Sequence, residues 1–146
     1  MFDTTFLSVR CTVAGPMYQK VSESKTWDAA RAHCRTLGMD LAIVRSAADN
    51  AAIKAIAGGS NWDVWIGLHD KTTENRWVWV DGSNAVYTNW EPGEPNNQGN
   101  EDCVHMRRIP SRPDGKWNDL PCSRVSLPFV CQQREWRTRG RALRLL

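Results

Sequence analysis

The sequence predicts an α+β domain in which two helices precede a set of short strands. Two segments before Gly58 carry apolar residues at helical spacing, whereas later segments are short apolar runs between turn residues. The chain has 146 residues, of which 41% are hydrophobic and 24% charged, and these values are typical of one globular domain. We therefore expect one domain with mixed or antiparallel sheets.

The first helix is predicted shortly after a first strand at residues 18–21. Thr26 is a suitable N-cap residue, and Gly38 is suited to end the helix. Between them, apolar residues recur at positions i, i+3, i+7 and i+10: Trp27, Ala30, Cys34 and Leu37. Cys34 is therefore expected on the buried face of this helix.

The second helix follows a short apolar run at residues 41–44. Ser46, with Asp49 three residues later, forms a start similar to a capping box. One apolar side of the helix is expected from three residues: Ala52, Ile53 and Ile56. Gly58 and Gly59 should end the helix, which we expect to pack on the sheet.

Four further strands are predicted, at residues 65–68, 77–80, 103–106 and 129–131. The second of these ends at Asp81-Gly82, which is a turn sequence. The tryptophans of the first two strands are expected in the core. The polar link between these two strands contains Asp70 and Glu74, and such residues are commonly solvated loop charges.

The positive charge of the chain is concentrated at its C-terminus. The formal net charge is +3, and residues 134–146 contain five arginines and one glutamate. Without this segment, 14 of the 19 Lys and Arg residues and 15 of the 16 Asp and Glu residues remain, so the rest of the chain is close to neutral. No apolar run reaches the roughly 18 residues needed to span a membrane, and residues 1–14 lack the apolar segment of a secretory signal peptide.

The five cysteines indicate disulfides and an oxidising compartment, because free thiols are uncommon at this density in a small domain. Their odd number leaves one cysteine over. Any four of them would allow three connectivities, and the sequence pattern by itself does not choose among these.

Oxygen-bearing side chains are concentrated in two segments, residues 94–103 and 117–122. They alternate with Gly and Pro and show neither a helical nor a strand period, so we expect them in loops. Ca²⁺ binds roughly 6–8 oxygen atoms from carboxylates, carboxamides and carbonyls, and all these groups are present. A calcium-binding loop is therefore the first hypothesis, and a polar loop clipped by a disulfide, without a ligand, is the alternative.

Several short motifs follow one another between the outer cysteines Cys34 and Cys131: Trp65-Ile66-Gly67-Leu68, Glu94-Pro95-Asn96, Glu101-Asp102-Cys103, Trp117-Asn118-Asp119 and Cys122. On these motifs, residues 17–133 resemble the carbohydrate-recognition domain of C-type lectins. An N-terminal arm at residues 1–16 and a basic tail at residues 134–146 flank this domain. The resemblance implies the C-type lectin fold, with two helices, two small mixed or antiparallel sheets and a long calcium-binding loop.

The resemblance also implies two disulfides, Cys34–Cys131 and Cys103–Cys122. The first would close a loop of nearly a hundred residues and contribute about 4–5 kcal/mol in the chain-entropy model. Cys11 would then be unpaired, or joined to a second copy of the chain. Its partner is expected to be missing because Met17 occupies the position where longer family members carry a second cysteine.

For the principal calcium site, the family motifs imply five ligands: Glu94, Asn96, Glu101, Asn118 and Asp119. Four of these would also contact sugar: Glu94, Asn96, Glu101 and Asn118. A vicinal diol on the metal can donate its protons to the two glutamates and accept hydrogen bonds from the two amides, which satisfies every polar group. Pro95 is expected to be cis by resemblance, which would turn Glu94 and Asn96 toward the same ion.

An auxiliary calcium site is also implied by the resemblance, at Asp70, Glu74, Asn97, Glu101 and Asp102. Family members that fill this site usually have Asp where this chain has Asn97. Because this substitution removes one negative charge, it should weaken the binding of calcium.

The Glu-Pro-Asn form of the family motif goes with equatorial 3- and 4-hydroxyls, as in mannose, N-acetylglucosamine and glucose, and with an equivalent pair in fucose. The Gln-Pro-Asp form goes with galactose. Residues 97–100 contain no aromatic side chain of the kind that often stacks on galactose. The implied function is a secreted, calcium-dependent, mannose-type lectin that recognises microbial or glycoprotein glycans in innate immunity.

The main alternative is a lectin-like domain that binds protein, or an anionic microbial surface such as lipopolysaccharide or lipid, without calcium. It would use the basic tail and the arginine-rich insert at residues 107–115. An enzyme is not expected, since the chain has no phosphate loop, Cys-x-x-Cys pair or His-Glu-x-x-His motif, and no nucleophile stands at an informative spacing from His33, His69 or His105. Nucleic-acid binding has no support beyond the charge of the tail.

Overall fold

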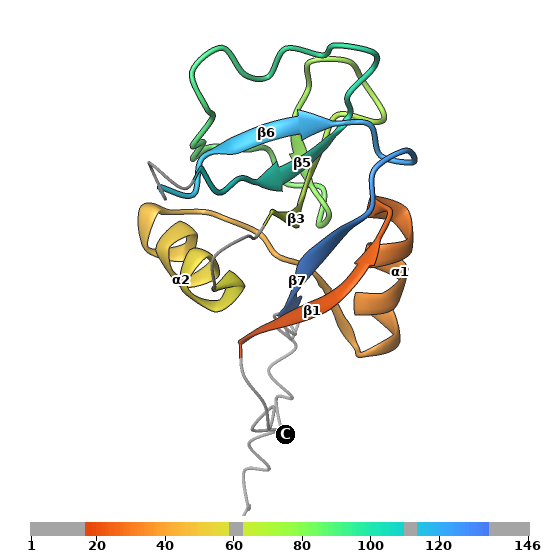
Figure 1. Ribbon diagram of the computed structural model, residues 1–146, viewed down its shortest axis with the longest axis vertical. Coiled ribbons are helices and arrows are strands. Elements are labelled where there is room, and N and C mark those ends of the chain that lie inside the picture. Colours follow the sequence, from red (N-terminus) through yellow and green to blue (C-terminus); the bar gives the residue numbers. More distant parts are fainter. Residues whose placement is uncertain (1–16, 59–62, 110–113, 135–146) are drawn as a thin grey trace, which may run out of the picture.

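The computed structural model describes residues 17–58, 63–109 and 114–134. The two helices come early and most strands late, as predicted (Figure 1). The elements are β1 (Tyr18–Lys25), α1 (Trp27–Thr36), β2 (Met39–Leu41), α2 (Ala47–Ala57), β3 (Val64–His69), β4 (Val78–Trp79), β5 (Cys103–Met106), β6 (Trp117–Leu120) and β7 (Leu127–Gln133). Among the described residues, no helix has the length and apolar character that crossing a membrane requires.

The strands form one seven-stranded sheet, and not the two small sheets that were expected. Its order is β1-β7-β3-β5-β6, with β2 added to β7 and β4 added to β3. The pairs are antiparallel except β3 with β7, which are parallel and joined at the register pair Trp65 and Phe129. These two side chains are fully buried in the same apolar cluster, so their packing joins the halves of the sheet.

Helix α1 begins directly after Thr26, as predicted, although the Thr26 side chain makes no capping hydrogen bond. Trp27, Ala30 and Cys34 are buried, but Leu37 is 44% exposed. The predicted apolar face was therefore one turn too long. The helix ends at Thr36, and Gly38 has the positive φ of +72° that glycine tolerates best.

Helix α2 has the predicted cap, in which the hydroxyl of Ser46 accepts a hydrogen bond from the backbone N–H of Asp49 (3.1 Å). Its buried face was predicted only in part, since Ile53 is buried as expected but the other two predicted residues are not. The buried residues are Asn50, Ile53 and Ala57, whereas Ala52 and Ile56 are exposed. The helix is turned this way because the buried amide of Asn50 binds the indole N–H of Trp117 (2.8 Å), a contact that apolar periodicity does not reveal.

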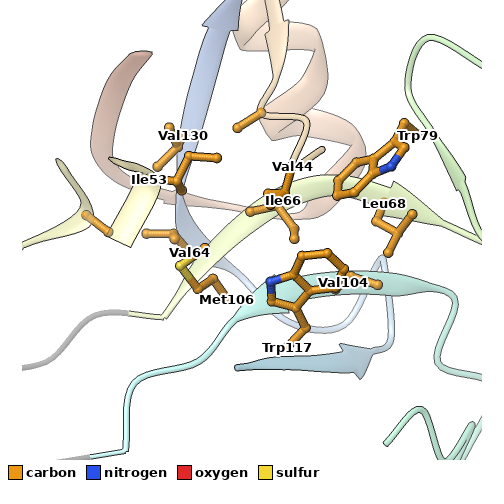
Figure 2. Close-up of a cluster of buried hydrophobic side chains, with 12 residues drawn as sticks. Val44, Ile53, Val64, Ile66, Leu68, Trp79, Val104, Met106, Trp117 and Val130 are labelled. Carbon is orange, nitrogen blue, oxygen red and sulfur yellow. The ribbon is translucent and has the colours of Figure 1, made fainter. Parts of the chain in front are cut away.

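The core lies on both faces of β3. Val64, Ile66 and Leu68 alternate along the strand and pack with Ile53, Val104, Trp79 and Trp117 on one face (Figure 2). Trp65 belongs to the second cluster, together with Trp27 and Phe129. The prediction that Trp65 and Trp79 are core residues is confirmed, while Trp77 is only partly buried.

Two disulfides hold the fold together, and both pairings implied by the family resemblance are confirmed. Cys34–Cys131 joins α1 to β7, with a Cα–Cα distance of 5.4 Å. Cys103–Cys122 joins the start of β5 to the turn that follows β6, at 5.2 Å. Cys11 lies outside the described residues.

Candidate functional site

The long segment between β4 and β5, drawn in green at the top of Figure 1, runs beside β6. Its first anchor is Trp117, whose N–H donates to the carbonyl of Asn89 (2.8 Å) and whose carbonyl accepts from the N–H of Glu91 (2.8 Å). The indole of Trp117 packs edge-on against Trp90 and Trp79 in the core. A buried tryptophan therefore fixes the direction of the segment, called here the ligand loop (residues 89–102).

Asn118 and Asp119 lie on β6, and not in a loop as predicted. The strand pairs antiparallel with β5, so Asn118 faces His105 and Asp119 faces Val104 in the register. Because Trp117-Asn118-Asp119 is short and largely polar, its pattern did not indicate a strand. Its pairing with β5 is a long-range contact that only the fold supplies.

Asp119 joins the ligand loop to β6 and is completely buried. Its two carboxylate oxygens accept hydrogen bonds from the backbone N–H groups of Asn96 (3.2 Å) and Asn97 (2.8 Å). The Glu94–Pro95 peptide bond is cis, as expected from the resemblance. The Glu94 carboxylate accepts from both the backbone N–H and the side-chain amide of Asn96, each at 3.0 Å.

Negative charge accumulates where these groups meet. The pKa of Glu94 is raised to about 7, mainly by burial. Asp119 contributes to this shift, because the two carboxyl groups can share a proton and because Asp119 is negatively charged. The pKa of Glu101 is also raised, by burial and then by Asp119, and the guanidinium of Arg124 partly offsets this. Three carboxylates that repel one another in this way are suited to a multivalent cation.

Asn118 has a buried partner that sequence reasoning missed. Its side-chain nitrogen lies 3.1 Å from Nε2 of His105, which is 3% exposed. Burial lowers the pKa of His105 to about 4, so the imidazole is neutral at pH 7 and Nε2 can accept a hydrogen bond from the amide. The Asn118 amide keeps its oxygen and its second N–H for other partners. The sequence pattern did not reveal this contact, because it depends on the register between β5 and β6, which pairs His105 with Asn118.

A second acidic cluster contains Asp70, Glu74 and Asp102, with one ligand atom from each residue within 4.8 Å of the others. Asp70 is 2% exposed, and burial is the main reason why its pKa rises to about 6, with further contributions from Glu74 and Asp102. One oxygen of Asp70 accepts from the N–H of Asn75 (2.8 Å). The other oxygen and Oδ1 of Asp102 are buried without a hydrogen-bond donor in the described part of the chain.

Asn97 and Glu101, also expected at the auxiliary site, contact each other. The side-chain oxygen of Asn97 accepts a hydrogen bond from the backbone N–H of Glu101 (3.0 Å). Asn97 has a φ of +50°, a conformation that Asn adopts more readily than most residues. Its side chain therefore stabilises the turn of the ligand loop whether or not it contacts a metal.

Comparisons with known proteins identify the family and support the fold. The family described as "Lectin C-type domain" matches residues 23–133. The chain is 36% identical over 126 residues to the alpha-N-acetylgalactosamine-specific lectin of Patiria pectinifera, covering 81% of this chain and 74% of that protein. It is 38% identical over 126 residues to the C-type lectin mannose-binding isoform of Oxyuranus scutellatus, covering 82% and 78% of the two chains.

Longer relatives and solved structures match the same region. The chain is 37% identical to human C-type lectin domain family 17, member A, but spans only 30% of that protein. The carbohydrate-recognition domain of cow CD23, solved in the presence of a GlcNAc2Man3 oligosaccharide, superposes with a TM-score of 0.69 at 34% identity and covers 78% of this chain and 84% of that one. These matches support a binding domain rather than an enzyme. The chain belongs to the C-type lectin domain family.

Proposed function

We propose that this chain binds carbohydrate through a calcium ion held by five residues of the ligand loop and β6: Glu94, Asn96, Glu101, Asn118 and Asp119. The observation that carries the proposal is the position of Asp119. Its buried carboxylate accepts hydrogen bonds from the N–H groups of Asn96 and Asn97, which gathers the cis-proline loop against β6. Burial and then the negative charge of Asp119 raise the pKa values of Glu94 and Glu101 beside it, and a cation would relieve both effects.

The donor set suits a sugar diol as well as a cation. When bound, calcium supplies coordination positions for two hydroxyl oxygens. Glu94 and Glu101 then accept hydrogen bonds from the sugar hydroxyl groups, while the amides of Asn96 and Asn118 donate hydrogen bonds to the hydroxyl oxygens. Asn118 can do this because its amide nitrogen has two hydrogens, of which His105 needs only one. The Asn96 amide donates one of its two hydrogens to Glu94, and the second remains for a sugar hydroxyl.

We assign mannose-type specificity from the residues, because the names of the relatives do not agree on one sugar. Glu94 and Asn96 flank Pro95 in the acid-then-amide order that the family uses for equatorial 3- and 4-hydroxyls. Exchanging acid and amide would exchange acceptor and donor around the diol. Residues 97–100 offer no aromatic ring to stack on galactose.

A second calcium ion is proposed at Asp70, Glu74 and Asp102, with Asn97 and Glu101 as further ligands. Its support is the pair of buried oxygens on Asp70 and Asp102 that have no donor within residues 17–58, 63–109 and 114–134. An unsatisfied buried carboxylate oxygen is costly, and a cation would satisfy both oxygens at once.

The proposed setting is extracellular, with microbial or glycoprotein glycans as targets in innate immunity. The two disulfides support an oxidising compartment. Contact through one diol is weak, so useful avidity would need several copies on a polyvalent target. A bridge through Cys11 is one proposed way to join copies.

The test is retention on immobilised mannan in calcium, followed by elution with a chelator and competition by free mannose or galactose. We expect mannose to elute the protein and galactose not to do so. The double change Glu94→Gln/Asn96→Asp should reverse this preference while keeping calcium dependence. Retention that ignores the chelator would contradict the proposal.

A further inference from the structure

The end of the molecule opposite the ligand loop carries a group of arginines. The start of β1, the end of α1 and the end of β7 meet there, at the bottom of Figure 1. Three guanidinium groups surround the single carboxylate of Asp40, with N–O distances of 3.2 Å for Arg31, 3.8 Å for Arg35 and 3.8 Å for Arg134. Among the described residues of this group, three positive charges thus share one negative charge.

The three arginines are not equivalent. Arg31 also donates to the carbonyl of Val80 (3.0 Å), and its side chain is only 25% exposed, so it fixes α1 to the sheet. The side chains of Arg35 and Arg134 are 53% and 47% exposed, and each touches Asp40 only at a long distance. Exposed ion pairs of this kind contribute little to the stability of the fold. Most donors of these two guanidiniums therefore face solvent.

Exposed apolar side chains lie beside these arginines. Leu37, two residues after Arg35, is 44% exposed, and Met17 is 48% exposed. The carbonyl of Met17 accepts from the N–H of Gln133, which places Met17 next to the residue that precedes Arg134. The other large exposed apolar residues in the described part of the chain, Ile56 and Val86, lie on α2 and in the segment after β4.

We propose that these four residues, Met17, Arg35, Leu37 and Arg134, called here the basic end, bind an anionic lipid surface. Guanidinium groups pair with lipid phosphates, and Leu and Met side chains enter the boundary between headgroups and acyl chains. An anionic polysaccharide would use the arginines but gain little from the apolar pair. The sequence after Arg134 continues the same composition, with four more arginines and three leucines.

This inference does not depend on the proposed sugar site. The basic end and the ligand loop lie at opposite ends of the domain, so a lipid surface at one end leaves the other end accessible (Figure 1). Binding at the basic end should therefore need no calcium and should be insensitive to mannose. It should weaken as salt increases, because its charges are exposed.

The experiment is sedimentation of the full-length chain with vesicles of phosphatidylglycerol and phosphatidylcholine, in chelator, against vesicles of phosphatidylcholine alone. We expect binding to the anionic vesicles only. Arg35→Gln/Arg134→Gln should weaken it roughly tenfold, whereas Arg45→Gln/Arg107→Gln, which removes the same charge from other exposed positions, should change it less than about twofold. Thermal unfolding of each variant checks that it is folded.

A second pair of variants separates lipid from polysaccharide. Met17→Ser/Leu37→Ser should weaken vesicle binding by about fivefold, whereas Ile56→Ser/Val86→Ser should not. Equal losses in both arginine pairs would overturn the proposal, because net charge alone would then explain binding. It would also be overturned if the chain bound heparin but not the anionic vesicles, or if Met17→Ser/Leu37→Ser had no effect.

Discussion

The two acidic clusters differ in how the protein prepares them. In the cluster at the ligand loop, backbone and side-chain N–H groups of the protein already donate to Asp119 and Glu94. In the second cluster, buried oxygens of Asp70 and Asp102 have no donor among the described residues. N–H groups of the protein therefore satisfy part of the first cluster, whereas the second contains buried oxygens whose stability cost a cation or a proton would remove.

The largest expected effect comes from breaking the first cluster at Asp119. Asp119→Asn should abolish retention on mannan. The NH2 group that replaces one carboxylate oxygen cannot accept a hydrogen bond, so the bond from the N–H of either Asn96 or Asn97 is lost. The free energy of unfolding in chelator should fall by about 2 kcal/mol, the scale of one charge-assisted hydrogen bond. Equilibrium denaturation and mannan retention measure the two effects.

A matched control for Asp119→Asn is Asp81→Asn, since Asp81 also accepts a backbone N–H, from Ser83, but lies away from both clusters. This change should leave retention unaltered. If Asp119→Asn still bound mannan in a calcium-dependent way, the proposed principal site would be wrong.

A smaller loss is expected when the support of Asn118 is removed. His105→Phe keeps the buried ring but removes the acceptor for the Asn118 amide, so mannan affinity should fall about tenfold, as is common for groups that orient a metal ligand. His105→Gln, which retains an acceptor, should recover part of the loss. His33→Phe, next to Phe129 on the other side of the fold, should have no effect on titrations with mannose. Equal affinities for wild type and His105→Phe would show that the contact is incidental.

In the second cluster, removing a carboxylate should increase the stability of the protein in chelator, whereas Asp119→Asn should decrease it. Asp70→Asn removes a buried negative charge that repels Glu74 and Asp102, so thermal stability in chelator should increase, by about 1 kcal/mol. The same change should reduce the stabilisation gained on adding calcium. Asp28→Asn, at a carboxylate exposed on α1, is the control. A loss of stability in chelator would show that the orphaned oxygens carry no cost.

The smallest effect is the pH dependence of calcium stabilisation. The folded-state pKa values of Glu94 (about 7) and Asp70 (about 6) lie above their ordinary values of 4.5 and 3.8. The stability linked to these groups is therefore fully present below the ordinary values and is lost as pH rises through the folded values. Calcium replaces the lost protons, so the difference in Tm between calcium and chelator should grow from about pH 5 to about pH 7.5. A constant difference would contradict this linkage.

Local sequence patterns predicted the elements whose signals lie within a few residues. The cap at Ser46 and the stop at Gly38 depend on contacts inside one turn, and both are as predicted. Val64–His69 and Cys103–Met106 are apolar enough to be recognised as strands. The buried face of α2 was predicted only in part: Ile53 is buried as expected, but Asn50 is also buried, where it accepts a hydrogen bond from Trp117, far along the chain.

The sequence by itself determined the family, through motifs that keep their residue types and order, and with the family came the disulfide pairs and the cis bond at Pro95. Only the tertiary structure decided that β3 and β7 unite the sheet, that Asn118 meets His105, and that Asp70 and Asp102 keep orphaned oxygens. The reason is physical: each of these contacts joins residues far apart in sequence, and strand register and burial, which local periodicity does not encode, decide whether they meet.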